Sequence, residues 1–229
     1  MSRQEKLAAL ASTGVTKAEL DNIDGGTARG TTAIADGDGV LINDAGTMRM
    51  TSVETMATYI GTKVGGGMEF IASSGTISDA ASVAFTGFDA SKYDSYKFYL
   101  LNVVPATNAA DLLSRVSING GSSYDTTNGS YYTTQDYAYM QVRTSIAGAS
   151  GDTTGVSGTF TAFNPAYTGG YRLFLVEAVN ETTSANYVHE VDAKAYKANE
   201  GTAINAIQFF MSSGNIESGE ITMFGIVNS

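Results

Sequence analysis

From Met68 onward, the hydrophobic and polar positions of the chain follow a strand pattern. Segments rich in Tyr, Phe, Val, Ile and Thr alternate between apolar and polar residues, and clusters of Gly, Asn, Ser and Asp separate them. Alternation with a period of two is typical of half-buried β-strands. We therefore predict strands at Met68–Ala72, Ser82–Phe85, Ser95–Val104, Leu112–Ile118, Tyr131–Thr144, Val156–Phe163, Tyr171–Asn180, Asn186–Tyr196, Ala203–Met211 and Glu220–Val227. Such a series suits an antiparallel β-sandwich of jelly-roll type.

The predicted strands differ in how many of their faces are apolar. In segment 186–196, Tyr187, His189 and Val191 share one face and charged residues share the other, which predicts that one face is wet. Segments 171–179 and 203–211 are apolar on both faces for much of their length. Strands of this kind lie between a core and a second covering surface, and that surface could be another subunit.

Residues 1–64 carry helix signals instead. Capping boxes, in which a hydroxyl caps a backbone N–H and a Glu three residues later reaches back, predict three short helices. The pairs are Ser2/Glu5, Thr16/Glu19 and Thr51/Glu54, with the first helix running through Leu10 and the second over Lys17–Ile23. The third helix places Val53, Met56 and Ile60 on one apolar face. Because helices this short need a partner, we assign this face to assembly.

Small strands are predicted at 32–35, 40–43 and 47–50, with Asp-Gly and Asp-Ala-Gly turns between them. The acidic and amide residues Asp36, Asp38, Asn43 and Asp44 could offer oxygen ligands to Ca²⁺. The EF-hand pattern fails, because Val40 occupies the fifth ligand position and the twelfth is not Glu. We interpret these residues as turn formers whose side chains bond their own backbone, and predict no metal site.

The glycines at 65–67 are the predicted domain boundary. Three residues without Cβ resist both helix and strand and permit a free change of direction. The sequence therefore predicts a small α/β assembly module at 1–64, a glycine linker at 65–67 and a mainly β domain at 68–229. The module has too few large apolar side chains for a self-sufficient fold, which favours oligomerisation.

The composition excludes several classes of site. The 229 residues include no Cys, which removes disulfides, thiolate zinc sites and cysteine nucleophiles. Lys and Arg number 13 against 23 Asp and Glu, and a net charge of -10 has the wrong sign for binding phosphates, so no nucleic-acid partner is predicted. No segment approaches the roughly 18 apolar residues of a membrane span, and the apolar run near the start is too short for a signal peptide.

Catalytic chemistry has little support in the sequence. His189 is interpreted as a core histidine, because no nucleophile motif accompanies it. The carboxylates of Glu177, Glu181, Glu190 and Asp192 could flank a glycosidic bond if the fold brought two of them together, but solvated strand edges also explain them. Nucleotide, zinc-protease and redox motifs are missing, so neither an enzyme activity nor a cofactor is predicted.

The segment INGGSSYDTTNGSYYTTQDYAYM places tyrosines among small polar residues. This composition is typical of binding surfaces, because Tyr offers a large amphipathic area at low entropic cost. The candidate receptor-binding residues are Tyr124, Tyr131, Tyr132, Asp136 and Tyr137. Tyr131 and Tyr132 are adjacent, so an extended backbone would point them to opposite sides and leave at least one free for a ligand. The alternative is a Tyr-rich strand of the sandwich.

Two parts of the chain resemble tail-fibre proteins of marine and cyanobacterial bacteriophages. The run GTTAIADGDGVLINDAGTMRMTSVETMATYI is similar to a module near the N-terminus of such fibres. The stretches FTGFDASKYDSYKFYLLNVVPATNAADLLSRVSINGGSSYD and FFMSSGNIESGEITMFGIVNS resemble their β-sandwich tip domain.

The resemblance implies a homotrimer in the virion, made in the host cytoplasm, with its N-terminal part attached to other tail proteins. Its C-terminal domain would bind a glycan or protein on the host surface. A short trimeric tail fibre is the expected function. A head-decoration or tail-adaptor protein and a glycan depolymerase are the alternatives.

Overall fold

The computed structural model describes residues 2, 4–5, 14, 31–63, 67–132, 136–148, 154–183, 186–198 and 201–227. The chain divides into two compact units, Met1–Lys63 and Val64–Ser229. The division falls within two residues of the three glycines. The predicted helix over Lys17–Ile23, with its capping pair Thr16/Glu19, lies outside the described residues.

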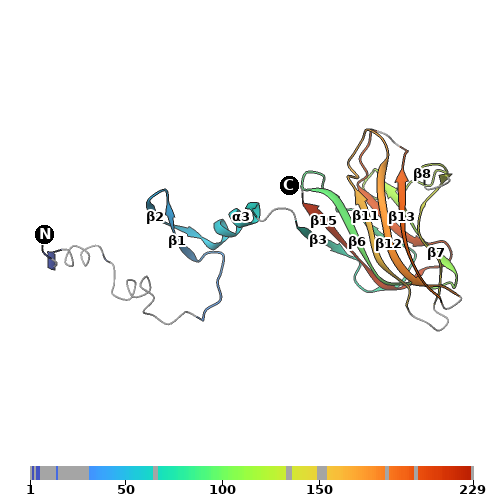
Figure 1. Cartoon of the computed structure of the whole chain (residues 1–229), viewed down its shortest axis with the longest axis horizontal. Coiled ribbons are helices and arrows are strands. Elements are labelled where there is room, and N and C mark those ends of the chain that lie inside the picture. Colours follow the sequence, from blue (N-terminus) through green and yellow to red (C-terminus); the bar gives the residue numbers. More distant parts are fainter. Residues whose placement is uncertain are drawn as a thin grey trace. The chain divides into compact units, whose positions relative to one another are not determined.

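The first unit contains a hairpin followed by a helix (Figure 1). Strands β1 (Gly39–Asp44) and β2 (Thr47–Ser52) pair in antiparallel register, and α3 (Val53–Lys63) follows β2 directly. The Ser52 hydroxyl caps this helix by accepting the Thr55 N–H at 3.1 Å, so the cap lies one residue after the predicted Thr51. The predicted strand at 32–35 is wrong, because these residues have no strand partner.

The hydroxyl and carboxylate of the first capping box meet as predicted. The Glu5 N–H donates to the Ser2 hydroxyl at 3.2 Å, and the Ser2 N–H donates to the Glu5 carboxylate at 2.5 Å. This reciprocal pair satisfies two backbone donors at the start of a helical turn.

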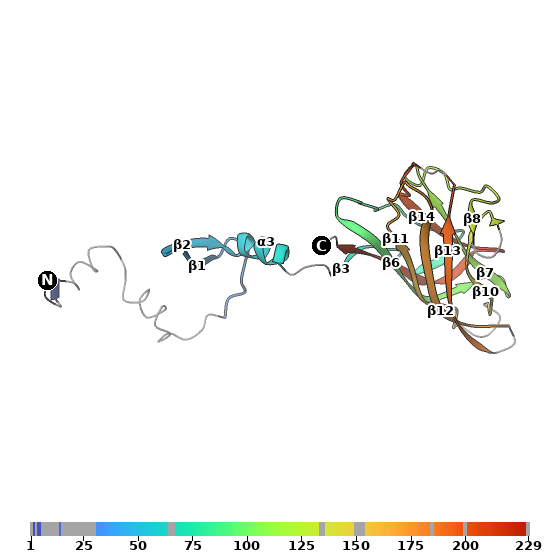
Figure 2. The same ribbon diagram turned by 45° about the horizontal axis from the view of Figure 1, so that its top comes forward.

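The second unit is an antiparallel β-sandwich, which confirms the predicted fold class (Figures 1 and 2). Its strands are β3 (Met68–Ser73), β4 (Ile77–Ala80), β5 (Val83–Phe85), β6 (Tyr93–Pro105), β7 (Ala110–Ser117), β8 (Tyr131–Tyr132), β9 (Asp136–Tyr137), β10 (Met140–Ile146), β11 (Val156–Phe163), β12 (Arg172–Glu181), β13 (Tyr187–Tyr196), β14 (Ala206–Met211) and β15 (Ile216–Val227). The larger, nine-stranded sheet has the order β3-β15-β6-β11-β12-β13-β8-β9, and β4 also pairs with β15. The smaller sheet has the order β10-β7-β14-β5.

The core lies between the two sheets and is centred on phenylalanines. Phe98 of β6 and Phe160 of β11 point inward from the larger sheet, and Phe209 of β14 meets them from the smaller one. The ring centroids of Phe98 and Phe209 are 5.4 Å apart, and those of Phe160 and Phe209 are 5.5 Å apart. Edge-to-face contacts of this kind stabilise a core beyond simple area burial.

Two expectations about strand boundaries are wrong. The predicted strand 131–144 is divided into β8, β9 and β10, and β10 belongs to the smaller sheet. The last strand begins at Ile216, before the predicted Glu220, because β15 continues through Gly219 as a bulge. Gly219 has φ of +121°, and a Cβ there would lie 2.5 Å from the Asn102 carbonyl oxygen, so only glycine fits.

Candidate functional site

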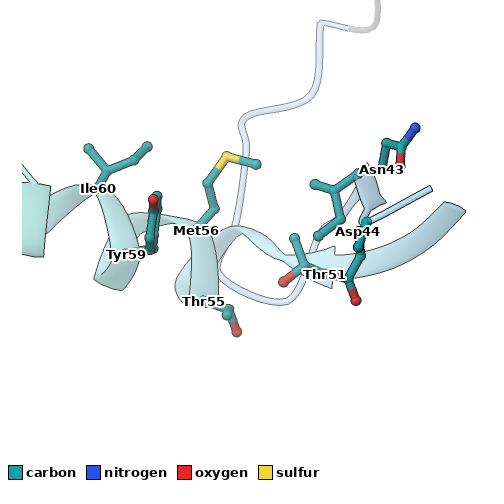
Figure 3. Close-up of a pocket in the computed structure, with 9 residues that line it drawn as sticks. Asn43, Asp44, Thr51, Thr55, Met56, Tyr59 and Ile60 are labelled. Carbon is teal, nitrogen blue, oxygen red and sulfur yellow. The ribbon is translucent and has the colours of Figure 1, made fainter. Parts of the chain in front are cut away.

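The hairpin and the helix of the first unit line an open pocket of about 710 Å³ (Figure 3). Met56 and Ile60 rise from the same side of α3, and Tyr59 lines the pocket with them. Ile42 and Thr51 line it from the hairpin. Two of the three predicted assembly residues therefore contribute to one concave surface, and Val53 is only partly buried at the start of the helix.

None of the side chains described in residues 31–61 is buried. Large apolar side chains are exposed on the strands and the helix alike. They are Leu41 at 51%, Met48 at 57%, Met50 at 71%, Tyr59 at 63% and Ile60 at 48%. Burial of apolar area is the main favourable term in folding, so residues 31–61 have no core of their own to stabilise them.

Backbone hydrogen bonds nevertheless define the local geometry of this unit. The Val53 N–H donates to the Asp38 carbonyl at 2.9 Å, and the Glu54 N–H donates to the Asp36 carbonyl at 3.2 Å. These bonds use donors that the first turn of a helix leaves unsatisfied, and they hold α3 against the turn before β1. The pocket therefore has a defined shape although its walls lack a core.

The acidic and amide residues of the hairpin are engaged locally. The Asp38 carboxylate accepts the Ala35 N–H at 2.9 Å, and the Asn43 side chain accepts the Gly46 N–H at 2.7 Å. Asp44 pairs with Arg49 at 2.9 Å. Within the described residues, no cluster of three metal-ligating side chains occurs. The turn-forming interpretation of Asp38 and Asn43 is thus confirmed by their hydrogen bonds.

Tyr131, a predicted receptor-binding residue, is a core residue with 1% of its surface exposed. Its hydroxyl accepts the Val116 N–H at 3.1 Å and donates to the Asp125 carbonyl at 2.9 Å. Its ring lies 5.1 Å from that of Tyr196. The binding role predicted for Tyr131 is wrong in this structure, because the short strand β8 pairs with β13 and turns this side chain inward.

The neighbouring candidates lie at the edge of the larger sheet. Tyr132 is 46% exposed on the opposite side of β8, as expected for adjacent residues of a strand, and Lys197 lies 5.8 Å from its ring centroid. Tyr137 is half-buried and stacks on Tyr139 at 5.6 Å. Asp136 pairs with Tyr132 in the backbone register, and its side chain lies outside the described atoms. Of these residues, Tyr132 presents the most open aromatic surface.

Tyr124 lies in a second, polar pocket of about 240 Å³ at the end of β7. The pocket is lined by Val116, Ser117, Ile118, Asn119, Ser123, Tyr124, Asp125 and Tyr196. The Tyr124 hydroxyl oxygen is buried and has no hydrogen-bond partner among the described atoms. Burial raises the pKa of Tyr124, so this hydroxyl stays protonated.

Asp125 is the charged group of this pocket. Burial opposes its ionisation, but several donors outweigh this effect and hold its pKa below the usual range. The Thr127 N–H donates to the carboxylate at 2.8 Å, and the Tyr196 hydroxyl donates at 2.8 Å. The carboxylate therefore remains ionised at neutral pH and keeps a fixed orientation.

The loop that carries the pocket is braced at both ends. Asn119 accepts the Ser117 hydroxyl at 2.7 Å and the Ser123 N–H at 3.0 Å. Asn205, from the loop before β14, accepts the Gly120 N–H at 2.8 Å and donates to the Ile118 carbonyl at 3.1 Å. These bonds preorganise the polar groups around Tyr124.

His189 is exposed, which contradicts its interpretation as a core histidine. Its side chain is 58% exposed and lies 3.7 Å from the Glu177 carboxylate on the neighbouring strand. The apolar face of β13 that also carries Val191 is the wet face of the sheet. On the opposite face Lys194 is buried, and Glu190, which is itself exposed, reaches the buried Arg143 at 2.6 Å. The alternation was correct, but the choice of buried face was inverted.

The four dispersed carboxylates lie in different surroundings. Glu177 lies on the outer face of the sheet, and Glu190 lies on the inner face with Arg143. Glu181 accepts the Thr154 hydroxyl at 2.5 Å, and Asp192 pairs with Lys194. Each of these carboxylates therefore has its own partner in the structure.

The outer face of the larger sheet carries exposed apolar residues, which the sequence analysis did not identify as a group. The exposed side chains are Tyr99 at 38%, Leu101 at 57%, Phe163 at 44%, Leu173 at 55%, Val179 at 45% and Val191 at 58%. Within the described part of the chain, no second layer covers them. The doubly apolar pattern of segment 171–179 was the signal for this face.

Comparison with known proteins gives no relative from which a role can be transferred. No protein-family model matches this chain, and no curated protein or solved structure matches it. Among the residues that the structure describes, none of the helices is long and apolar enough to cross a membrane. The two pockets and the exposed apolar surfaces are therefore the features that bear on function.

Proposed function

We propose that this chain is a structural protein of a bacteriophage virion, a short trimeric tail fibre. Its first unit joins copies of the chain to each other and to other tail proteins. Its β-sandwich binds a glycan or protein on the host surface. The virion location in this proposal rests on the sequence resemblance. The self-association rests on the exposed apolar residues of the structure.

The observation that carries the proposal is the lack of any buried side chain in residues 31–61. A hairpin and one short helix cannot offset the entropy of folding without burying apolar area. These apolar side chains are exposed in every folded copy of the segment. The partner that covers them must therefore be present as soon as the chain is made. Another copy of the same chain meets this condition, and closed rings of identical subunits are the usual result.

The pocket beside Met56 and Ile60 supplies a surface for this association. It is concave and mostly apolar, and exposed residues such as Met48 and Met50 on the hairpin of a neighbouring copy have the chemistry to fill it. Such an arrangement buries both sets of side chains at once. The exposed outer face of the larger sheet offers a second apolar surface to neighbouring copies.

Light scattering on the full-length protein tests the assembly. We expect the mass of three chains at micromolar concentration, and a stable folded monomer would contradict the proposal. Gold-labelled antibodies against the sandwich, applied to phage particles, test the location. Labelling along the tail supports a fibre, whereas labelling on the head would favour the decoration protein.

Incubation with host polysaccharide separates adhesion from depolymerisation. A fibre that only binds leaves the number of reducing ends unchanged. New reducing ends would favour the depolymerase instead.

A further inference from the structure

We propose that the outer face of the larger sheet packs against the same face of a second copy of this chain. The half of the face formed by β3, β15 and β6 contacts the half formed by β12 and β13 of the neighbouring copy, and β11 lies between the two halves (Figure 1). This inference deepens the proposed self-association and rests on it for bringing the copies together. The contact lies in the sandwich rather than in the first unit, so it is tested separately.

The outward-facing residues of β12 are too apolar for a solvated surface. An antiparallel sheet with one wet face normally carries polar side chains on that face. The outward positions of β12 are instead occupied by Leu173, Leu175, Glu177 and Val179. The strand register places Phe163 of β11 opposite Leu173, so the apolar surface continues onto the next strand. A face of this composition suits a covering protein layer.

An aromatic groove marks the other half of the face. Phe224 of β15 makes edge-to-face contacts with Phe70 and Tyr99, with ring centroids 6.0 Å and 5.5 Å apart. Met68, Tyr99, Leu101 and Phe224 line an open groove of about 460 Å³. Its apolar lining suits the branched aliphatic side chains that β12 and β13 expose.

The exposed apolar area of the face is large enough for a stable contact. Eight large apolar side chains are between 38% and 63% exposed, and they are Met68, Phe70, Tyr99, Leu101, Phe163, Leu173, Val179 and Val191. At about 150 Å² for each side chain, the lower end of the range for aromatic residues, their exposed parts come to roughly 600 Å². A standard interface buries about 800 Å² per partner, and roughly 60% of this area is apolar. The face therefore meets the requirement.

The charges on the face favour contact between unlike halves. Lys97 of β6 has its amino group 5.9 Å from the Tyr99 ring centroid, and Glu177 is the outward carboxylate of β12. Contact between unlike halves brings Lys97 toward Glu177 of the neighbouring copy. Contact between like halves would instead oppose each of these charges to its own counterpart, which is unfavourable. Glu220, the carboxylate of the first half, already accepts the Ser73 hydroxyl at 2.6 Å.

A second copy is the expected occupant because the chain itself brings it to this face. Only four residues separate α3 from β3, a link that reaches at most roughly 18 Å. When the first units of two copies associate, their sandwiches are therefore held at a high effective concentration. Met68 is the first residue of β3 and also lines the groove, so the link ends beside the proposed contact.

Cysteine cross-linking of the full-length protein tests the contact. The chain contains no Cys, so one introduced thiol reports on one position. Leu101→Cys and Val191→Cys place thiols at exposed positions in the two halves and should leave the fold intact. The two variants are coexpressed and treated with a short bismaleimide, and mass spectrometry identifies the joined peptides. We expect the mixed pair to form in roughly tenfold higher yield than either variant joined to itself.

Ser122→Cys is the matched control, because Ser122 is exposed in the loop after β7 of the smaller sheet. Coexpressed with Val191→Cys, it should give only the background yield. A charge exchange tests which halves meet. Lys97→Glu should lower the yield of the mixed pair, and Glu177→Lys in the same chain should restore it.

Equal cross-linking yields for all pairs would assign the face to a partner other than this chain and overturn the proposal. Preferential joining of Leu101→Cys to itself would also overturn it. Light scattering on the same samples reports the proposed assembly separately. A mass of three chains without preferential cross-linking would contradict the outer-face contact and leave the trimer standing. Preferential cross-linking in an assembly of another mass would support the contact and contradict the trimer.

Discussion

Arg143 on β10 and Asn180 on β12 join the two sheets of the sandwich through a buried hydrogen bond. The Arg143 Nε donates to the Asn180 Oδ1 at 2.6 Å, and the two residues are 2% and 1% exposed. The same guanidinium donates to Glu190 of β13 at 2.6 Å. A cation in this position is tolerated because its donors are satisfied by partners from two strands of the opposite sheet.

Replacing Arg143 with alanine should destabilise the sandwich. The variant leaves the Asn180 amide oxygen buried and removes the partner of Glu190, so we expect a loss of about 3 kcal/mol. Urea denaturation of the full-length protein measures this change. Lys92→Ala is the control, because it removes an ion pair with Glu69 whose side chains are 50% and 45% exposed. Its effect on stability should be much smaller than that of Arg143→Ala, because exposed ion pairs contribute little, and equal effects would contradict the bridging role of Arg143.

The hydroxyl of Tyr131 is predicted to stabilise the fold. Tyr131→Phe leaves the Val116 N–H buried without an acceptor, which should cost about 1–3 kcal/mol. Tyr132→Phe, with a ring that is 46% exposed, should have no measurable effect on stability. Thermal melts of both variants check this contrast. If the two melting temperatures agree, Tyr131 does not have the structural role assigned to it.

The burial of Tyr96 should make the stability of the fold fall at alkaline pH. Burial raises its pKa from the model-compound value of 10.0 to about 12, and the Asp89 N–H that donates to its hydroxyl opposes this rise only in part. The unfolded chain therefore loses this proton at lower pH than the folded chain does. The stabilising contribution is complete below pH 10 and is lost as the pH rises toward 12.

Phenolate absorbance follows this titration directly. We expect a fraction of the tyrosines to ionise only near pH 12 or on unfolding, and Tyr96→Phe to reduce that fraction. Complete ionisation near pH 10 in the folded protein would show that Tyr96 is not buried as described.

A charge placed in the first pocket should block assembly. Met56→Glu or Ile60→Glu would force a carboxylate into the apolar contact between copies, and such burial is strongly unfavourable. Light scattering should then report monomers. Thr58→Glu is the matched control, since Thr58 lies on the same helix, is exposed and does not line the pocket. Retained assembly in the Met56 and Ile60 variants would place the association surface elsewhere.

The sequence predicted the strands well where alternation was regular. Strand β11 begins and ends where its pattern predicts, at Val156 and Phe163. The four residues of β4 were missed, because a segment this short that includes Asp79 at φ of +48° shows no regular alternation. A pattern also cannot say which face is covered, and on β13 Glu190 pairs with Arg143, which lies 47 residues away in the sequence.

The candidate site was predictable as a segment and less so as individual residues. The mixture of Tyr with Ser, Asn and Asp marks the loop that contains the Tyr124 pocket. Tyr131 has the same local composition but is buried, because pairing between β8 and β13 is a long-range contact. Tyr196 belongs to the pocket through the same pairing, and nothing near it in the sequence indicates this.

The chain enters the sandwich at β3, which is one edge strand of the larger sheet, whereas Tyr196 borders the polar pocket beside Tyr124 near the other edge. A force applied between this end of the sandwich and the glycines at 65–67 would therefore act across the sheet. Hydrogen bonds of an antiparallel sheet run in this direction, perpendicular to the strands. The hydrogen-bond ladders between β3 and β13 would bear this tension in series. The weakest ladder would therefore set the force that the attachment withstands.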